Sequence, residues 1–274
     1  MTRLLDNAVA QEDLGVSHEW SLRRVTLADG RRVFVKQARR PIDGLFAAEA
    51  AGLHWLAEAD GAPVPEVLAA DDTTLVLPWI ETGPPTAEAA ERFGRELAAL
   101  HGSGAPAYGA PWPGYIASLP LDNGPGDDWP EWYARRRVLP YVREAVDRGA
   151  LSARDAAEIE RALHHVADAA GPPEPPARIH GDLWSGNVLW TEDRAWLIDP
   201  AAHGGHRETD LAMLALFGAP RLERVIAAYD EAAPLADGWR DRVPLHQLHP
   251  LLVHVALFGA SYRDQALAAA RSLT

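Results

Sequence analysis

The sequence contains no cysteine, only one lysine and no long apolar run. Without cysteine the chain can form no disulfide, no zinc–thiolate site and no thiol nucleophile. It has no stretch of about 18 uninterrupted apolar residues, so we expect no membrane span. The first residues lack an apolar segment followed by a cleavage site, so we expect no signal peptide and a cytoplasmic location.

Basic charge is also scarce, because the formal net charge at pH 7 is −13. Proteins that bind nucleic acid or anionic membranes need a basic face, so the composition argues against both kinds of partner. A small anionic ligand held together with metal ions remains compatible with an acidic chain. The length of 274 residues and a hydrophobic content of 47% predict one large domain or two joined lobes with a packed core.

Lys36 is the single lysine among 26 basic residues. A GC-rich genome explains why most surface cations are arginine, but it leaves the one lysine unexplained. A lysine ammonium is a compact point charge and an arginine guanidinium is a planar fork, so the two are not interchangeable at a tight site. We therefore expect Lys36 to be functional.

The first part of the chain alternates short apolar runs with turn residues, which predicts a small, mostly antiparallel sheet carrying one helix. The predicted strands are residues 22–27, 32–36, 66–69 and 74–77. Asp29 and Gly30 suit a tight hairpin between the first two strands. The helix is predicted over residues 44–59, with Asp43 as its N-cap.

The second part of the chain has mainly helical periodicity. Helices are predicted over residues 86–101, about 132–147 and 152–169, and two short strands flank residues 191–193. Between them, the Gly- and Pro-rich residues 102–130 are expected to wrap the surface or to line a site. The sequence therefore predicts an α+β protein of two lobes, with a ligand cleft between them.

The densest chemical signal is the segment 180–187, read His-Gly-Asp-Leu-Trp-Ser-Gly-Asn, with Asp199 following at a strand end. This His-x-Asp-x4-Asn spacing is typical of kinases. In that chemistry Asp182 accepts the proton of the substrate hydroxyl, while Asn187 and Asp199 supply oxygen ligands to magnesium. Taken singly, Asp182 and Asn187 could instead be ordinary turn residues. The joint spacing favours the kinase interpretation.

The same chemistry needs a cation for the nucleotide phosphates, and Lys36 is placed for it at the end of a predicted strand. Glu49, one turn into the following helix, is expected to hold the lysine, with Glu58 as a weaker alternative near the helix end. Two histidine groups, His203 with His206 and the set at 246, 249 and 254, could bind metal but are better interpreted as packing or surface residues. The sequence has no Walker-type glycine loop and no hydrolase nucleophile elbow.

The tryptophan version of the catalytic segment, residues 180–188, resembles the signature of the fructosamine kinase family. The resemblance extends over roughly residues 15 to 262. Further residues that carry it are 33–36, 46–50, 198–201, 205–208, 210–213 and 216–218. Aminoglycoside and choline phosphotransferases share the His-Gly-Asp and Asn elements but usually lack this tryptophan.

The resemblance implies a bilobal, protein-kinase-like fold with an N-lobe over residues 1–81 and a C-lobe over residues 82–274. It implies ATP-dependent phosphorylation, with Mg²⁺, of the sugar 3-hydroxyl of ketosamines such as fructosamine and ribulosamine adducts, which is a deglycation repair. The acceptor is a small ketoamine, or a glycated lysine on a protein. By the same resemblance Asp182 is the base, and Asp210 braces the catalytic loop.

The resemblance also guides the nucleotide site. The hairpin at residues 15–21 carries one glycine where protein kinases carry three, so backbone donors of Ser17 and His18 are expected to reach the phosphates. At the hinge, the carbonyl of Pro78 and the N–H of Ile80 are expected to recognise adenine, since proline itself has no N–H.

The acceptor side is less defined. Trp184 is expected either to stack on the substrate or to pack under the catalytic loop, and His206 with Glu208 to contact sugar hydroxyls. Three tryptophans of the long loop, Trp112, Trp129 and Trp132, either line this side or hold the loop in place. Two alternatives stay open: a phosphotransferase for an aminoglycoside, an amino alcohol or another small metabolite, and a catalytically silent nucleotide-binding scaffold.

Overall fold

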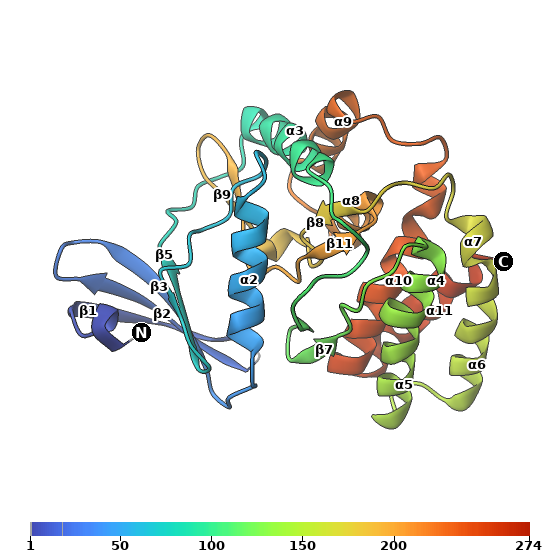
Figure 1. Cartoon of the computed structure of the whole chain (residues 1–274), viewed down its shortest axis with the longest axis horizontal. Coiled ribbons are helices and arrows are strands. Elements are labelled where there is room, and N and C mark those ends of the chain that lie inside the picture. Colours follow the sequence, from blue (N-terminus) through green and yellow to red (C-terminus); the bar gives the residue numbers. More distant parts are fainter. Residues whose placement is uncertain (1, 18) are drawn as a thin grey trace.

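A five-stranded antiparallel sheet occupies the N-terminal end of the chain, and helices dominate the remainder (Figure 1). This computed structural model describes residues 2–17 and 19–274. The strand order is β1-β2-β3-β5-β4. The strands are β1 (Ala8–Ser17), β2 (Trp20–Leu27), β3 (Arg32–Ala38), β4 (Ala69–Ala70) and β5 (Thr74–Pro78). The predicted α+β, bilobal architecture is confirmed.

The predicted hairpin corresponds to β2 and β3, which pair in antiparallel register. Gly30 lies in its turn with φ of 84°, a left-handed conformation that glycine adopts without steric cost. The strand predicted over residues 66–69 is shorter and later than expected, since only Ala69 and Ala70 pair with β5. Ala69 and Ala70 form an edge strand, which pairs with only one neighbouring strand and is often very short.

Alternation along β3 gives the sheet two different faces. Val33 and Val35 pack into a small cluster with Val25 of β2. Phe34 and Lys36 face the other way, toward helix α2 (Leu45–Ala57), which lies beside the sheet in Figure 1. The sequence period of two therefore decides that Lys36 lies on the side that carries the cleft.

Helix α2 begins differently from the prediction. Gly44 is its N-cap, with φ of 73°, and no side chain caps the first turn. Asp43 is therefore not the N-cap, because the chain enters the helix through a left-handed residue that favours glycine. The predicted helix at residues 86–101 is confirmed as α3 (Ala87–Gly102), which Thr86 caps through its side chain.

The rest of the chain is mainly helical. Its other α-helices are α4 (Trp129–Tyr133), α5 (Leu139–Asp147), α6 (Ala153–Ala162), α7 (Val166–Ala169), α8 (Arg207–Leu216), α9 (Leu222–Ala232), α10 (Trp239–Phe258) and α11 (Arg263–Arg271). A short helix α1 (Thr2–Leu5) precedes the sheet. A π-helical turn, Ala134–Val138, joins α4 to α5, so the one helix predicted there is interrupted.

Three two-stranded ribbons lie within the helical part. They are β6 (Gly114–Ile116) with β7 (Leu119–Leu121), β8 (Ala177–Ile179) with β11 (His203–Gly205), and β9 (Val188–Trp190) with β10 (Ala195–Leu197). The β9–β10 ribbon confirms the two strands predicted around residues 191–193. The β6–β7 ribbon was not predicted and lies inside the long Gly- and Pro-rich segment.

One hydrophobic cluster crosses from the sheet into the helical part. It joins Phe46 of α2 and Leu75 of β5 to Phe93 of α3, Leu197 of β10 and Tyr229 of α9. Shared burial of this kind fixes the relative position of the two parts. No helix in residues 2–17 and 19–274 combines the length and apolarity needed to cross a membrane.

Candidate active site

A cavity of about 380 Å³ lies where the sheet and α2 meet the segments around β9, β10 and β6. It is lined by residues from Ser17 to Ala202, including side chains of the sheet and of the helical part. Seven of the predicted site residues line it: Ser17, Lys36, Glu49, Asp182, Trp184, Asn187 and Asp199. The structure therefore gathers into one cavity side chains that lie far apart in the sequence.

Lys36 is buried at the bottom of an ion-pair cluster. Its Nζ lies 2.9 Å from Oε2 of Glu49 and 3.2 Å from Oδ1 of Asp199. Burial alone would lower the pKa of Lys36, but the charges of Asp199 and Glu49 raise it, so the ammonium stays protonated. Glu58, the alternative partner, instead lies 3.6 Å from Arg178 at the surface.

The catalytic segment turns so that Asn187 reaches back to Asp182. The Nδ2 of Asn187 donates to the backbone carbonyl of Asp182 at 2.9 Å and to its Oδ2 at 3.1 Å. Because both contacts require the amide nitrogen, Oδ1 of Asn187 is left to accept a cation. Burial, and then the charge of Asp199, raises the pKa of Asp182 to about 7. A carboxylate with such a pKa is well matched to accepting a proton near neutral pH.

Asp199 follows β10 with φ of 53°, a left-handed conformation that costs energy in a residue with a Cβ. Its side chain is 38% exposed, into the cavity region beside Lys36. The free amide oxygen of Asn187 and the carboxylate of Asp199 are hard oxygen donors, which Mg²⁺ prefers. The donor set therefore fits the predicted metal, with coordination completed by phosphate oxygens and water.

Asp210 holds the catalytic segment from α8. Its carboxylate accepts the backbone N–H groups of His180 at 2.7 Å and Gly181 at 3.0 Å, and lies 3.1 Å from Nε2 of His101. Hydrogen bonds from two consecutive backbone groups fix the turn that carries Asp182. His101 was not predicted from the sequence, because it is one polar residue at the end of a predicted helix and has no motif of its own.

The predicted nucleotide contacts have different outcomes. Ser17, the last residue of β1, lines the cavity, whereas His18 lies outside the described residues. Pro78 ends β5 opposite Val33, and neither Pro78 nor Ile80 lines the cavity. Their part in adenine recognition stays a prediction.

Trp184 lies directly after Asp182 and Leu183 and is 38% exposed at the cavity. Its ring covers Gly186, where an added Cβ would overlap the indole. The ring therefore packs over the catalytic turn and faces the cavity as well, so the two interpretations of this tryptophan are not exclusive. Of the three loop tryptophans, Trp112 lines the cavity, while Trp129 and Trp132 are buried in the helical core.

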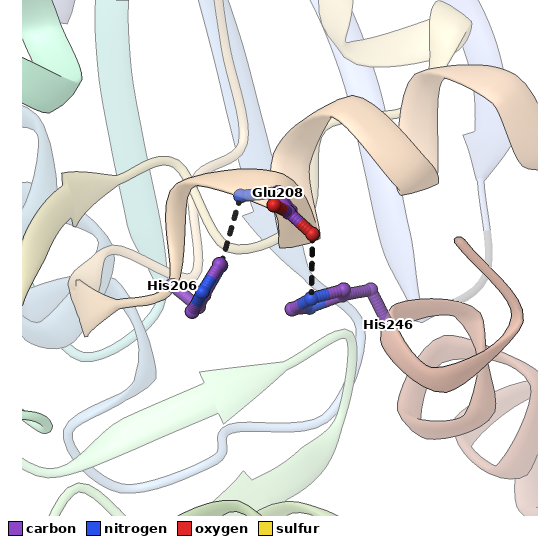
Figure 2. Close-up of side chains that lie close together, drawn as sticks. All are labelled: His206, Glu208 and His246. Carbon is purple, nitrogen blue, oxygen red and sulfur yellow. Dashed lines mark hydrogen bonds and ion pairs between the residues drawn. The ribbon is translucent and has the colours of Figure 1, made fainter. Parts of the chain in front are cut away.

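His206 and Glu208 do not reach this cavity, which corrects the prediction that they contact sugar hydroxyls. Both are buried at the start of α8 (Figure 2). The Nδ1 of His206 accepts the backbone N–H of Glu208 at 3.2 Å and so caps the helix. The carboxylate of Glu208 accepts two hydrogen bonds from Arg242, at 2.6 and 2.9 Å. Because α10 packs against α8, both side chains lie in the protein interior and not in the cavity.

His206, Glu208 and His246 place one donor atom each within 4.8 Å of one another, a spacing that a metal ion could use (Figure 2). The charges argue against a cation, because the Arg242 guanidinium already neutralises Glu208 in a bidentate pair. His246 is held by Thr209 at 2.9 Å on one ring nitrogen and lies 3.4 Å from Glu208 on the other. Although burial opposes it, hydrogen bonds from His246 and Arg242 lower the pKa of Glu208 to about 2. Glu208 and Arg242 thus form a buried ion pair, and burial lowers the pKa of both neighbouring histidines, which favours their neutral form.

Comparison with known proteins agrees with the geometry. A family model described as fructosamine kinase matches residues 13–273. A Thermus thermophilus protein named a probable ketoamine kinase is 39% identical over 233 residues, which is 84% of this chain and 83% of the relative. The crystal structure of a candidate fructosamine-3-kinase from Thermobifida fusca superposes with a TM-score of 0.95 at 57% identity, covering 99% of this chain and 97% of the other. A macrolide 2′-phosphotransferase from Brachybacterium faecium shares the fold, with a TM-score of 0.61 at 19% identity, over 95% of this chain and 91% of the other.

Proposed function

The chain belongs to the fructosamine kinase family, and we propose that it transfers the γ-phosphoryl group of ATP to the sugar 3-hydroxyl of ketoamines. Membership of this family makes it a phosphotransferase with a hydroxyl acceptor. The observation that supports phosphoryl transfer from ATP is the meeting of Lys36, Glu49 and Asp199 in the same cavity as Asp182. That cavity has room for a small acceptor beside a nucleotide's phosphates.

In the proposed reaction the acceptor hydroxyl oxygen forms a bond to the γ-phosphorus, the bond from that phosphorus to the β–γ bridging oxygen breaks, and ADP leaves. Asp182 takes the hydroxyl proton and orients the attacking oxygen. Lys36, held by Glu49, binds the α/β-phosphates. Mg²⁺ bound through Asn187 and Asp199 would neutralise charge on the phosphate oxygens.

The same proposal assigns nucleotide binding to residues 1–81 and the catalytic, metal and acceptor groups to residues 82–274. The acceptors are fructose- or ribulose-derived adducts of amines, including lysine, and the reaction takes place in the cytoplasm. A phosphate at the 3-position makes such an adduct fall apart, so the activity amounts to deglycation. The Trp-Ser-Gly sequence after Asp182 supports this acceptor class over aminoglycosides.

The proposal is tested by measuring ATP consumption and phosphorylated product with Mg²⁺ and fructosyl-lysine or ribulosyl-lysine. Wild type is compared with Asp182→Asn, which we expect to lose about 10²–10⁴-fold in kcat because a positioned base contributes that much. Asp168→Asn, an exposed position in α7, is the matched control and should retain wild-type activity.

Three other results would contradict parts of the proposal. Phosphorylation of an aminoglycoside or amino alcohol without any ketoamine would overturn the acceptor class. ATP binding without turnover on any acceptor would favour the silent scaffold. Full activity of Asp182→Asn would remove Asp182 as the base.

A further inference from the structure

One wall of the cavity comes from the long Gly- and Pro-rich segment, in which Trp112 but not Asn123 was named from the sequence as a candidate for the acceptor side. This wall consists of the β6–β7 ribbon with its flanking residues, from Trp112 to Asn123, and we call it the cleft hairpin. Trp112, Tyr115, Ala117 and Asn123 all line the cavity from it. In the proposed function Lys36 and the metal ligands bind the nucleotide phosphates, so this wall is available to contact the acceptor.

The cleft hairpin is held in place at both ends of the site. The hydroxyl of Tyr115 donates to the backbone carbonyl of Asp43 at 2.8 Å, just before α2. The ring of Trp112 lies edge-on to Trp55 of α2, with 5.6 Å between centroids. At the turn, Ala117 has φ of 49°, a conformation that L-residues avoid. Strain of this kind persists only where the surroundings fix it, and it is enriched at ligand sites.

Behind the cleft hairpin lies Arg137, an arginine buried to 2% exposure in the π-helical turn between α4 and α5. Its Nη2 donates to Oδ1 of Asn123 at 2.9 Å, its Nη1 donates to the carbonyl of Asp122, and its guanidinium stacks on Trp132 at 4.2 Å. No carboxylate forms an ion pair with it among the residues the structure describes. Burial lowers the pKa of Arg137 to about 9. A buried cation whose direct hydrogen-bond partners are all neutral is costly, although the nearby charge of Asp122 also favours it. π-Helical turns of the kind that carries Arg137 occur frequently at functional sites.

The contact with Arg137 decides which way the Asn123 amide points. A guanidinium can only donate hydrogen bonds, so Asn123 must turn its Oδ1 toward Arg137. Its Nδ2 is then on the other side, where the carbonyl of Trp112 lies 3.4 Å away, a long contact for one of two N–H groups. Asn123 therefore presents an oriented amide donor at the cavity wall.

We propose that Asn123 is a specificity-determining residue that donates a hydrogen bond from Nδ2 to a sugar hydroxyl oxygen of the ketoamine acceptor, with Arg137 as its positioning residue. The flat, apolar ring of Trp112 beside it suits the carbon face of the sugar. This inference rests on the proposed function for the identity of the acceptor. It adds the group that recognises the sugar.

The decisive variant is Asn123→Asp. It keeps the side-chain size and an oxygen for Arg137, but replaces the N–H donor with a second acceptor oxygen, so the sugar hydroxyl oxygen loses its donor. We expect the acceptor KM to rise roughly tenfold or more, because a site built to hydrogen-bond a substrate loses that much when a partner is removed. The KM for ATP should not change. Asn7→Asp, at an exposed position before β1, adds the same charge away from the cavity and should leave both constants unchanged.

The variant Arg137→Lys tests whether Arg137 orients Asn123 or only stabilises the fold. Lysine keeps the charge but cannot donate the planar set of hydrogen bonds to Asn123 and Asp122. We expect the acceptor KM to rise in this variant too, and the double variant with Asn123→Asp to show less than the product of the two effects. Thermal unfolding of each variant identifies losses that come only from destabilisation.

An unchanged acceptor KM in Asn123→Asp would overturn the inference, and so would a rise in the KM for ATP alone. If wild type phosphorylates a different alcohol and no ketoamine, the proposed function fails, and the same variants measured with that alcohol still decide the role of Asn123. Calorimetric titration of fructosyl-lysine into protein with a non-hydrolysable ATP analogue gives a readout without turnover. No binding to wild type there, together with no active acceptor, would overturn both proposals.

Discussion

The Nζ of Lys36 lies 3.2 Å from Oδ1 of Asp199, so the one lysine of the chain directly contacts a residue two positions after the end of β10. The same ammonium holds Glu49 at 2.9 Å. One cation thus joins a strand of the sheet, helix α2 and the proposed metal ligand. A substitution of Lys36, Glu49 or Asp199 should therefore alter the positions of the other two side chains, because a buried charge that loses its partner is left uncompensated.

We predict that Lys36→Arg lowers kcat/KM by at least about 100-fold, because a planar guanidinium does not fit a site made for a compact ammonium. Steady-state kinetics with ATP varied should detect the loss. Arg135→Lys, the reverse exchange at an exposed position of the π-helical turn, should have no effect. Near-wild-type kinetics of Lys36→Arg would show that position 36 needs only a positive charge.

Because Trp184 packs over Gly186, we predict that adding a methyl group at position 186 weakens binding of the acceptor. A Cβ at position 186 would overlap the indole, so Gly186→Ala should displace the Trp184 ring from its place at the cavity. We expect Gly186→Ala and Trp184→Ala each to raise the acceptor KM, and the double variant to be no worse than Trp184→Ala alone. Additive effects in this double-mutant cycle would mean that Gly186 acts independently of the ring.

Asp210→Asn should weaken the catalytic turn and the fold together. An asparagine keeps one oxygen, so one of the N–H groups of His180 and Gly181 is left facing an amide NH₂. We expect a loss of about 1–3 kcal/mol in the free energy of unfolding for a buried donor without its acceptor. Urea denaturation measures this, and kcat should fall while the KM for ATP changes little. Wild-type stability of this variant would contradict the bracing role.

Glu208 should make stability depend on acid pH. Its folded-state pKa, about 2, lies below the ordinary value of 4.5, so its contribution is present above pH 4.5 and is lost as the pH falls toward 2. Relative to Glu208→Gln, wild type should lose up to about 3 kcal/mol of its advantage over that window. Urea unfolding of both proteins at several pH values below 6 measures the difference. A constant gap would mean that the pKa of Glu208 is the same in the folded and the unfolded protein, so that folding does not stabilise its carboxylate.

The parts of the site whose geometry is local could be predicted from the sequence. Asp182 and Asn187 lie within one short turn, so their spacing already implied that they meet, and the structure joins them at 3.1 Å. Alternation along β3 likewise placed Lys36 on the cavity face, since successive strand residues point to opposite sides. The hairpin, α3 and the β9–β10 ribbon were predicted for the same reason.

Which distant segments share a surface depends on the packing of the folded chain and could not be predicted from the sequence. The period of α8 does not reveal that Arg242 of α10 covers Glu208, and so the prediction for Glu208 and His206 had to be corrected. Nor does any local pattern reveal that Arg137 lies behind Asn123 and fixes its amide. These contacts depend on how helices and the cleft hairpin pack across long sequence separations, and burial there overrides the chemistry suggested by residue type alone.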